Sequence, residues 1–178
     1  HILTDAVRGV NKTLSSDKEA AESATNATGY LSVFGTDGFT VTGGDASNGV
    51  GRTYAAWNWK AASTASGTTT GSGTLKAYNA RYNTDAGFSI INFRGNGTSG
   101  HTIPHHLGVV PDFVVVKSWS NASVGWVVYH SANTAAPETD FLMLAETAAT
   151  SDNAAMWNDT APTSSVFTIG NNSNVNGD

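Results

Sequence analysis

The sequence predicts an all-β fold made of antiparallel β-sandwich units, jelly-roll or lectin-like, arranged in tandem. Val outnumbers Leu fifteen to seven, and β-branched side chains favour strands because they lose rotamer freedom in helices. Several short runs alternate apolar and polar residues. Turn dipeptides such as Asp37-Gly38, Asn48-Gly49, Asn96-Gly97 and Ser99-Gly100 separate these runs. Many short strands divided by tight turns are typical of a sandwich or barrel.

Eight strands are predicted, in chain order 30–34, 39–42, 53–59, 88–94, 112–119, 125–130, 140–145 and 166–169. In the third, alternation places Ala55, Trp57 and Trp59 on one face. The run FVVVKSW at 113–119 begins continuously apolar, which predicts a central strand covered on both faces.

One helix is a candidate, at the capping box Ser16-Asp17-Lys18-Glu19 that leads into Ala20 and Ala21. A polar loop explains the same residues equally well. Both alternatives stay open.

The domain organisation is predicted from one stretch without bulky side chains. Residues 61–74, AASTASGTTTGSGT, contain no aliphatic residue larger than Ala. Such stretches bury too little surface to offset their ordering entropy, so 61–75 is predicted to be an irregular, exposed linker. Residues 1–60 would then be the C-terminal part of one repeat unit. Residues 76–178 would be the next sandwich unit, incomplete at its C-terminus.

A self-comparison supports a tandem repeat. A shift of 128 residues aligns Leu14 with Leu142 and Phe39 with Phe167, and gives nine identities in fifty positions without a gap. Apolar residues fall on apolar residues and the Asn48-Gly49 turn falls on Asn176-Gly177. The aligned residues are therefore predicted to occupy equivalent buried positions in two units.

Composition excludes several classes of function. Nine Lys and Arg against fourteen Asp and Glu give a net charge of −5, which disfavours nucleic-acid binding. No apolar run approaches the ~20 residues of a membrane helix, so membrane insertion is not expected. Zero Cys removes disulfides and thiol chemistry. No nucleophile elbow or phosphate loop is present, and the four Glu lie in polar segments. The sequence therefore proposes no catalytic residue, no cofactor and no enzyme.

The segment HTIPHHLG at 101–108 holds the only histidine cluster. A zinc site needs three or four converging ligands, and no nearby acid or Cys completes the set. His105 and His106 are adjacent, so an extended chain points them to opposite faces. The prediction is therefore no metal site, and hydrogen bonding from His105 to the backbone that holds the turn at Gly108.

Aromatic side chains are the remaining candidates for binding. Exposed Trp and Tyr rings are platforms for sugar rings, whereas a core rich in Val, Ala and Gly needs bulky residues to fill it. Core positions are predicted for Trp57 and Trp126. The candidate glycan-binding residues are Trp119, Trp157 and Tyr129.

A family resemblance rests on GNGTSGHTIPHHLGVVPDFVVVKSW at 95–119, followed by GWVVYH at 125–130. These segments, together with WNDTAPTSSVFTIG at 157–170 and TYAAWNWKA at 53–61, resemble a repeat of tail-fibre and other virion structural proteins of marine bacteriophages. In that family the element H-x-L-G-x-x-P-x-x-V-x-V looks like a hairpin joining two core strands, with His105, Leu107, Gly108 and Pro111 as turn residues. The resemblance departs at His106, where Gly is more familiar, and residues 1–36 lack a counterpart of WNDTAPTS.

The resemblance implies a location on the virion and an adhesive or spacer role in a tail or head fibre, with no catalytic residues. The expected partners are other virion proteins, with host cell-surface polysaccharide and a homotrimer as further candidates. The competing hypothesis is a lectin-like module whose own loops bind host glycans. A glycan-cleaving enzyme has the least support.

Overall fold

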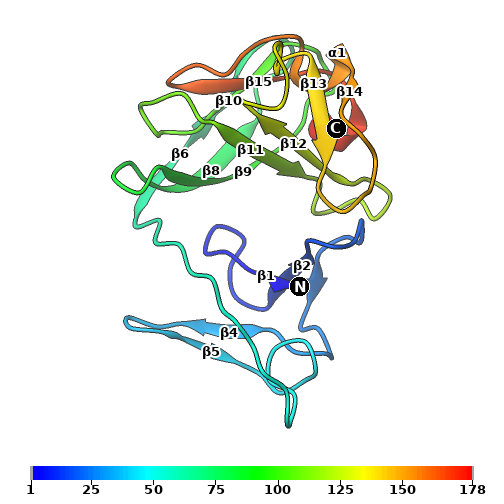
Figure 1. The fold of residues 1–178 in the computed structure, drawn as a ribbon. Helices are drawn as coiled ribbons and strands as arrows, with labels where there is room; N and C mark the ends of the chain where they lie inside the picture. Colours follow the sequence, from blue (N-terminus) through cyan, green and yellow to red (C-terminus); the bar gives the residue numbers. More distant parts are fainter. Residues whose placement is uncertain (1, 178) are drawn as a thin grey trace.

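The computed structural model describes residues 2–177, which form two parts joined by an elongated segment (Figure 1). Residues 2–50 form an N-terminal lobe and residues 63–177 a larger core unit, with residues 51–62 running between them. Every strand pair found among the described residues is antiparallel. The predicted all-β class is confirmed.

The N-terminal lobe consists of two small sheets. The first has the order β1-β2-β3 and the second pairs β4 with β5. Their bounds are β1 Ile2–Leu3, β2 Lys12–Ser15, β3 Ser23–Ala24, β4 Leu31–Phe34 and β5 Phe39–Val41. The Asp37-Gly38 turn closes the β4–β5 hairpin, where the Gly35 amide donates to the Gly38 carbonyl at 2.8 Å. Both strands predicted in this lobe are confirmed.

Residues 16–22 form the loop between β2 and β3, so the polar-loop alternative is the correct one. The Lys18 amide donates to the Ser15 carbonyl at 3.3 Å, and residues 17–20 are exposed. A short helix is stable only when an apolar face packs against something. Ala20 and Ala21 offer little apolar surface for that purpose.

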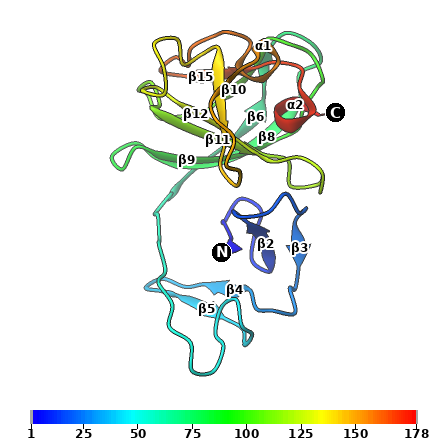
Figure 2. The ribbon, with the colours of Figure 1, turned by 45° about the vertical axis from the view of Figure 1, so that its right-hand side comes forward.

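The core unit contains three sheets and two single-turn helices (Figure 2). The sheet orders are β6-β8-β9, β15-β10-β7 and β11-β12-β13-β14. The strand bounds are β6 Ser63–Thr68, β7 Thr70–Gly71, β8 Ala77–Asn83, β9 Phe88–Phe93, β10 His101–Pro104, β11 Phe113–Lys117, β12 Trp126–His130, β13 Asp140–Met143, β14 Ser151–Asp152 and β15 Val166–Ile169. The helices are α1 Ala154–Trp157 and α2 Ser173–Asn176.

The hydrophobic core lies where these sheets and helices meet. It is formed by the buried side chains of Ile103, Val116, Val127, Tyr129, Met156, Trp157, Phe167, Ile169 and Val175. Two edge-to-face pairs of aromatic rings pack within this core. Phe93 meets Phe167 edge-on at 6.3 Å between centroids, and Tyr129 meets Trp157 in the same way at 6.0 Å.

The predicted linker at 61–75 is not irregular, because it contains β6 and β7, although most of it is exposed as predicted. β6 pairs with β8 over six residues, from Ser63 opposite Tyr82 to Thr68 opposite Ala77. Backbone hydrogen bonds, which need no bulky side chain, hold it in the sheet. Its small residues also suit close packing, because a Cβ on Gly67 would lie 3.3 Å from the Tyr78 ring.

The actual connection lies just before that stretch. Residues 53–59, predicted to be a strand, form no strand, and residues 51–60 are all exposed. The alternating pattern is present, but it is not paired with another strand. The predicted core position of Trp57 is therefore wrong, since this side chain is 78% exposed.

The strand at 113–117 exists, but it is not central. β11 is the edge strand of its sheet, and Phe113 is 55% exposed. The central, buried strand is its neighbour β12, in which Trp126 to Tyr129 are all buried, as predicted for Trp126. Val116 of β11 is buried in the core, but an edge strand leaves one row of its backbone groups unpaired.

The residues aligned by the repeat do not occupy equivalent positions. Phe167 is 4% exposed and lies in the three-stranded sheet β15-β10-β7, whereas Phe39 is 40% exposed and lies in the two-stranded hairpin. Leu14 is 6% exposed in β2, and Leu142 is half-buried in β13. The prediction of equivalent buried positions is therefore wrong.

The segment 105–111 joins β10 to β11, which belong to different sheets, so the expected hairpin is not formed. The predicted backbone hydrogen bonds of His105 are present. Its Nε2 lies 3.0 Å from the Thr163 carbonyl, and its Nδ1 accepts the Leu107 amide at 3.2 Å. His105, Leu107 and Pro111 are buried, and Gly108 supplies a φ of 75°.

His106, at the position where the repeat that the sequence resembles has Gly, adopts the left-handed conformation with a φ of 62°. Its imidazole stacks on Tyr82 at 5.2 Å and lies against Tyr78 at 5.6 Å. Ring contacts of this kind offset the backbone strain that a side chain suffers at positive φ.

We expect His106→Ala to destabilise the protein more than His106→Gly, by about 1 kcal/mol, because Ala keeps the strain and loses the stacking. Urea unfolding of the two variants measures the difference. Equal stabilities would contradict a strained turn at this position.

Candidate functional site

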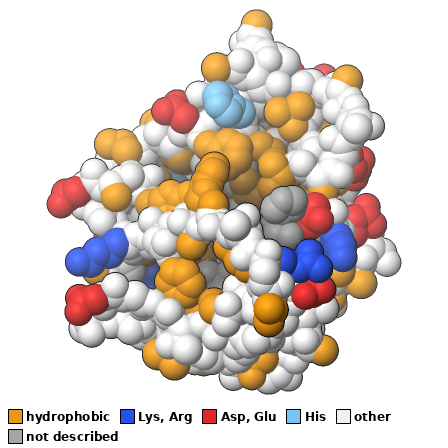
Figure 3. Space-filling view, turned by 60° about the horizontal axis from the view of Figure 1, so that its bottom comes forward, with side chains coloured by type: hydrophobic (Ala, Val, Ile, Leu, Met, Phe, Trp, Pro, Cys, Tyr) orange, Lys and Arg blue, Asp and Glu red, His pale blue; other side chains and the backbone are white. Residues whose placement is uncertain are grey.

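A groove of about 3,120 Å³ lies between the N-terminal lobe and the core unit. Its walls are the edge strands β9 and β11, the connecting segment, and the β4–β5 hairpin of the lobe. Hydrophobic side chains gather in the middle of this face (Figure 3). The groove is therefore a large, mostly apolar concave surface.

Three aromatic rings follow one another along the groove. Trp57 meets Trp59 edge-on at 6.3 Å, and Trp59 stacks on Phe88, at the start of β9, at 5.6 Å. The stacking pins the end of the connecting segment to the core unit. Trp57 and Trp59 remain 78% and 57% exposed.

The beginning of the connecting segment is fixed by a loop of the lobe. The Tyr54 hydroxyl donates to the Asp45 carbonyl at 2.8 Å and accepts the Gly49 amide at 2.7 Å. Arg52 pairs with Asp45 at 3.0 Å. Both ends of the segment are thus held, and Trp57 between them is exposed to solvent.

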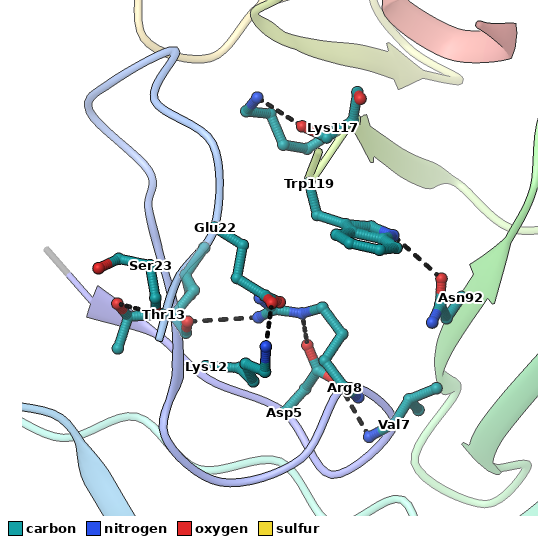
Figure 4. A network of polar contacts seen from close by, with 12 residues as sticks. Asp5, Val7, Arg8, Lys12, Thr13, Glu22, Ser23, Asn92, Lys117 and Trp119 are labelled. Atoms are coloured by element: carbon teal, nitrogen blue, oxygen red, sulfur yellow. Dashed lines mark hydrogen bonds and ion pairs between the residues drawn. The ribbon is translucent and has the colours of Figure 1, made fainter. Parts of the chain in front are cut away.

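Trp119 is the one candidate glycan-binding residue that is accessible. It follows β11 and is 43% exposed, and its Nε1 donates to the Asn92 side-chain oxygen at 3.2 Å (Figure 4). This bond fixes the ring at the wall of the groove. The Trp119 carbonyl accepts the Glu22 amide at 2.7 Å, so the lobe reaches the core unit at this residue.

The other two glycan-binding candidates are core residues, so their assignment is wrong. Tyr129 is 4% exposed and Trp157 is 2% exposed, and their rings pack against each other. Burial also raises the pKa of the Tyr129 hydroxyl. A sugar cannot reach either ring in this fold.

Next to Trp119, a charge network stiffens the lobe (Figure 4). Arg8 bonds Asp5 at 2.6 Å and Glu22 at 3.0 Å, and Lys12 bonds the other Glu22 oxygen at 3.0 Å. The Arg8 and Glu22 side chains are only 9% exposed. The two positive groups, on Arg8 and Lys12, balance the two negative groups, on Asp5 and Glu22. The network therefore stabilises the lobe and carries no net charge.

His101 and His105 are engaged inside the fold. The His101 Nδ1 lies 3.2 Å from the Asn176 side-chain oxygen, and its Nε2 lies 2.6 Å from the Thr69 hydroxyl. Both ring nitrogens of His105 have backbone partners as well. Within residues 2–177, no group of three His, Asp or Glu side chains is placed to hold a metal ion.

The His105 contacts require a neutral imidazole, because the His105 Nδ1 must accept the Leu107 amide. Burial lowers the pKa of His101 and of His105 below the ordinary value of 6.5. As the pH falls, the unfolded chain therefore binds protons before the folded chain does.

We expect the free energy of unfolding to be highest above about pH 7 and to fall as the pH drops below about 6.5, until the lowered pKa values are reached. NMR titration of the histidine C–H signals checks the cause. His101 and His105 should titrate below their own values in the urea-denatured chain. Folded-state midpoints above the denatured ones would contradict this account.

The residues that sequence reasoning missed are Phe88, Val109, Val110 and Phe113, which are all in the groove wall. Val109 and Val110 are 59% and 54% exposed. Their signal was the apolar run on both sides of Pro111. The part of this run at 113–119 predicts a central strand, because nothing in the local sequence shows whether a strand lies at a sheet edge.

The fold and the groove define an all-β domain with an open, aromatic face. No helix within residues 2–177 is long and apolar enough to cross a membrane. Residues 1–178 match the model of DUF7483, a domain of unknown function, and the chain belongs to this family. No curated protein and no solved structure matches the chain.

Proposed function

We propose that the chain is a structural and adhesive module of a phage virion appendage, a tail or head fibre, in which β-sandwich units present or space a host-binding surface. The proposal rests on the resemblance of residues 95–130 to the virion repeat. It is supported by how the fold uses that segment, since His101 and His105 make internal hydrogen bonds.

The observation that carries the proposal is the division between the two surfaces of this segment. The His101 and His105 side chains face inward, whereas Val109, Val110 and Phe113 are exposed and face the groove. A surface of this kind suits contact with another molecule more than chemistry on it. Many copies of such a module gain affinity through multivalency without a tight single site.

Immunogold labelling with antibodies against the purified chain tests the location. We expect gold on a tail or head appendage of phage particles that encode the sequence. Particles without gold, when an antibody against their capsid labels them, would contradict the proposal. A reducing-sugar assay on host polysaccharide is expected to show no cleavage by the purified chain.

A second candidate function is glycan binding at Trp119. The observation that favours it is an exposed ring fixed by a side-chain amide, because the ring face can pack on a sugar while Asn92 lies within reach of hydroxyl groups. Its partner would be host cell-surface polysaccharide.

A glycan array with Trp119→Ala and Trp119→Phe variants tests this candidate. The Ala variant is expected to lose about tenfold in affinity and the Phe variant to keep most of it, since Phe retains an aromatic face. Binding that is equal in the wild type and both variants would remove Trp119 from the site.

A further inference from the structure

The chain exposes more surface than a compact monomer of its size. Its accessible area is 9516 Å² for a mass of 18.4 kDa. Folded monomers of this mass expose about 8,200 Å², so the excess is about 1,300 Å². A standard protein–protein interface removes about 800 Å² from each partner. The excess is therefore large enough to be covered by one partner molecule.

The exposed apolar groups gather on one side. Trp57, Trp59, Val109, Val110 and Phe113 are all more than half exposed, and all of them line the groove. Apolar patches of this kind on soluble proteins mark interaction sites. Aromatic side chains without charges are typical of the centre of a protein–protein interface.

The same side offers backbone groups that are not paired with other backbone groups, although the Ala56 and Lys60 carbonyls accept side-chain amides. No backbone–backbone hydrogen bond is found for residues 53–62 within the described chain. The edge strands β9 and β11 each have a neighbour on one side only in their sheets. Extended segments and free strand edges pair readily with another chain.

The uncharged apolar face permits contact with a second copy of the chain, whereas polyanionic partners are disfavoured. The chain carries a net charge of −5, which disfavours nucleic acids and anionic surfaces. The five aromatic and valine side chains named above are uncharged, so two copies bring no like charges together there. These residues also have no side-chain carboxylate, amide or hydroxyl group to satisfy sugar hydroxyls.

We propose that a second copy of this chain covers the apolar face, with Trp57 and Phe113 near the centre of the contact and the segment 53–60 pairing along a strand edge of the other copy. The isolated structure is then one subunit of a homo-oligomer. The inference goes beyond the adhesive role and does not depend on it.

Sedimentation equilibrium on the full chain tests the proposal, with Trp57→Ser and Phe113→Ser as interface variants. Leu75→Ser is the matched control, because Leu75 is 51% exposed and does not line the groove. The wild type and the control are expected to associate below about 100 µM. The two interface variants are expected to weaken association by at least about tenfold. Unchanged circular dichroism and thermal melting show that each variant is folded.

Ala56→Pro tests the backbone part separately, because it removes an amide donor and leaves both tryptophans in place. We expect it to weaken association too. A wild type that stays monomeric at about 100 µM overturns the proposal. It is also overturned if the Trp57 and Phe113 variants associate as strongly as the Leu75 control.

Discussion

Replacing Phe167 by Ala is expected to lower the free energy of unfolding by about 3–5 kcal/mol. Phe167 is 4% exposed in β15, lies opposite Ile103 of β10 and meets Phe93 edge-on. Its removal leaves a cavity between two sheets that the surrounding strands cannot fill. Urea unfolding followed by tryptophan fluorescence measures the loss.

Phe39→Ala is the matched control, because the sequence aligns Phe39 with Phe167 while the structure places it at the exposed hairpin. The expected loss is below about 1 kcal/mol. A loss as large as that of Phe167→Ala would show that the two positions are equivalent after all, and would restore the repeat.

Replacing Asn176 by Ala is expected to have an effect of similar size, about 3–5 kcal/mol, since it leaves several buried polar groups unpaired. The Asn176 side-chain oxygen lies 3.2 Å from the His101 Nδ1 and accepts the Asn96 amide at 2.8 Å. Its nitrogen donates to the Gly170 and Thr98 carbonyls at 2.7 and 2.9 Å. One side chain thus joins α2, β10 and two loops.

Asn171→Ala is the control for this variant, because Asn171 is exposed just after β15. It is expected to change stability by less than about 0.5 kcal/mol. Thermal melting by circular dichroism compares the two variants. A loss below about 1 kcal/mol for Asn176→Ala would show that water replaces the missing amide.

Seven of the eight predicted strands are present, because each combines an alternating or apolar run with turn residues on both sides. Val166–Ile169 matches to the residue, between Ser165 and Gly170. Among the strands that were missed, β6 lacks this pattern, whereas β8 alternates Tyr78, Ala80 and Tyr82 with polar residues. β6 is made of Ser, Thr, Ala and Gly, and pairing to β8 holds it in place. Local sequence does not show such pairing.

The candidate site was predictable only in part, because burial depends on which strands become neighbours. Trp119 and Tyr129 both follow a run of valines, yet only Trp119 is accessible. Tyr129 is covered because β12 lies between β11 and β13. Trp57 is predicted to be buried but is exposed. The alternating pattern around it is typical of a strand, but residues 53–59 pair with no other described strand.

The connecting segment sets how far the lobe can travel. Residues 51–62 span at most about 40 Å when fully stretched, so a detached lobe stays close to its docking site. Three hydrogen bonds hold it there, from the Trp126 Nε1 to the Ser15 and Lys18 carbonyls and from the Glu22 amide to the Trp119 carbonyl. Tethering gives the lobe an effective concentration on the order of millimolar. Weak docking is therefore enough to keep the lobe against the core unit. A lobe pulled away by force is expected to dock again once the force is removed.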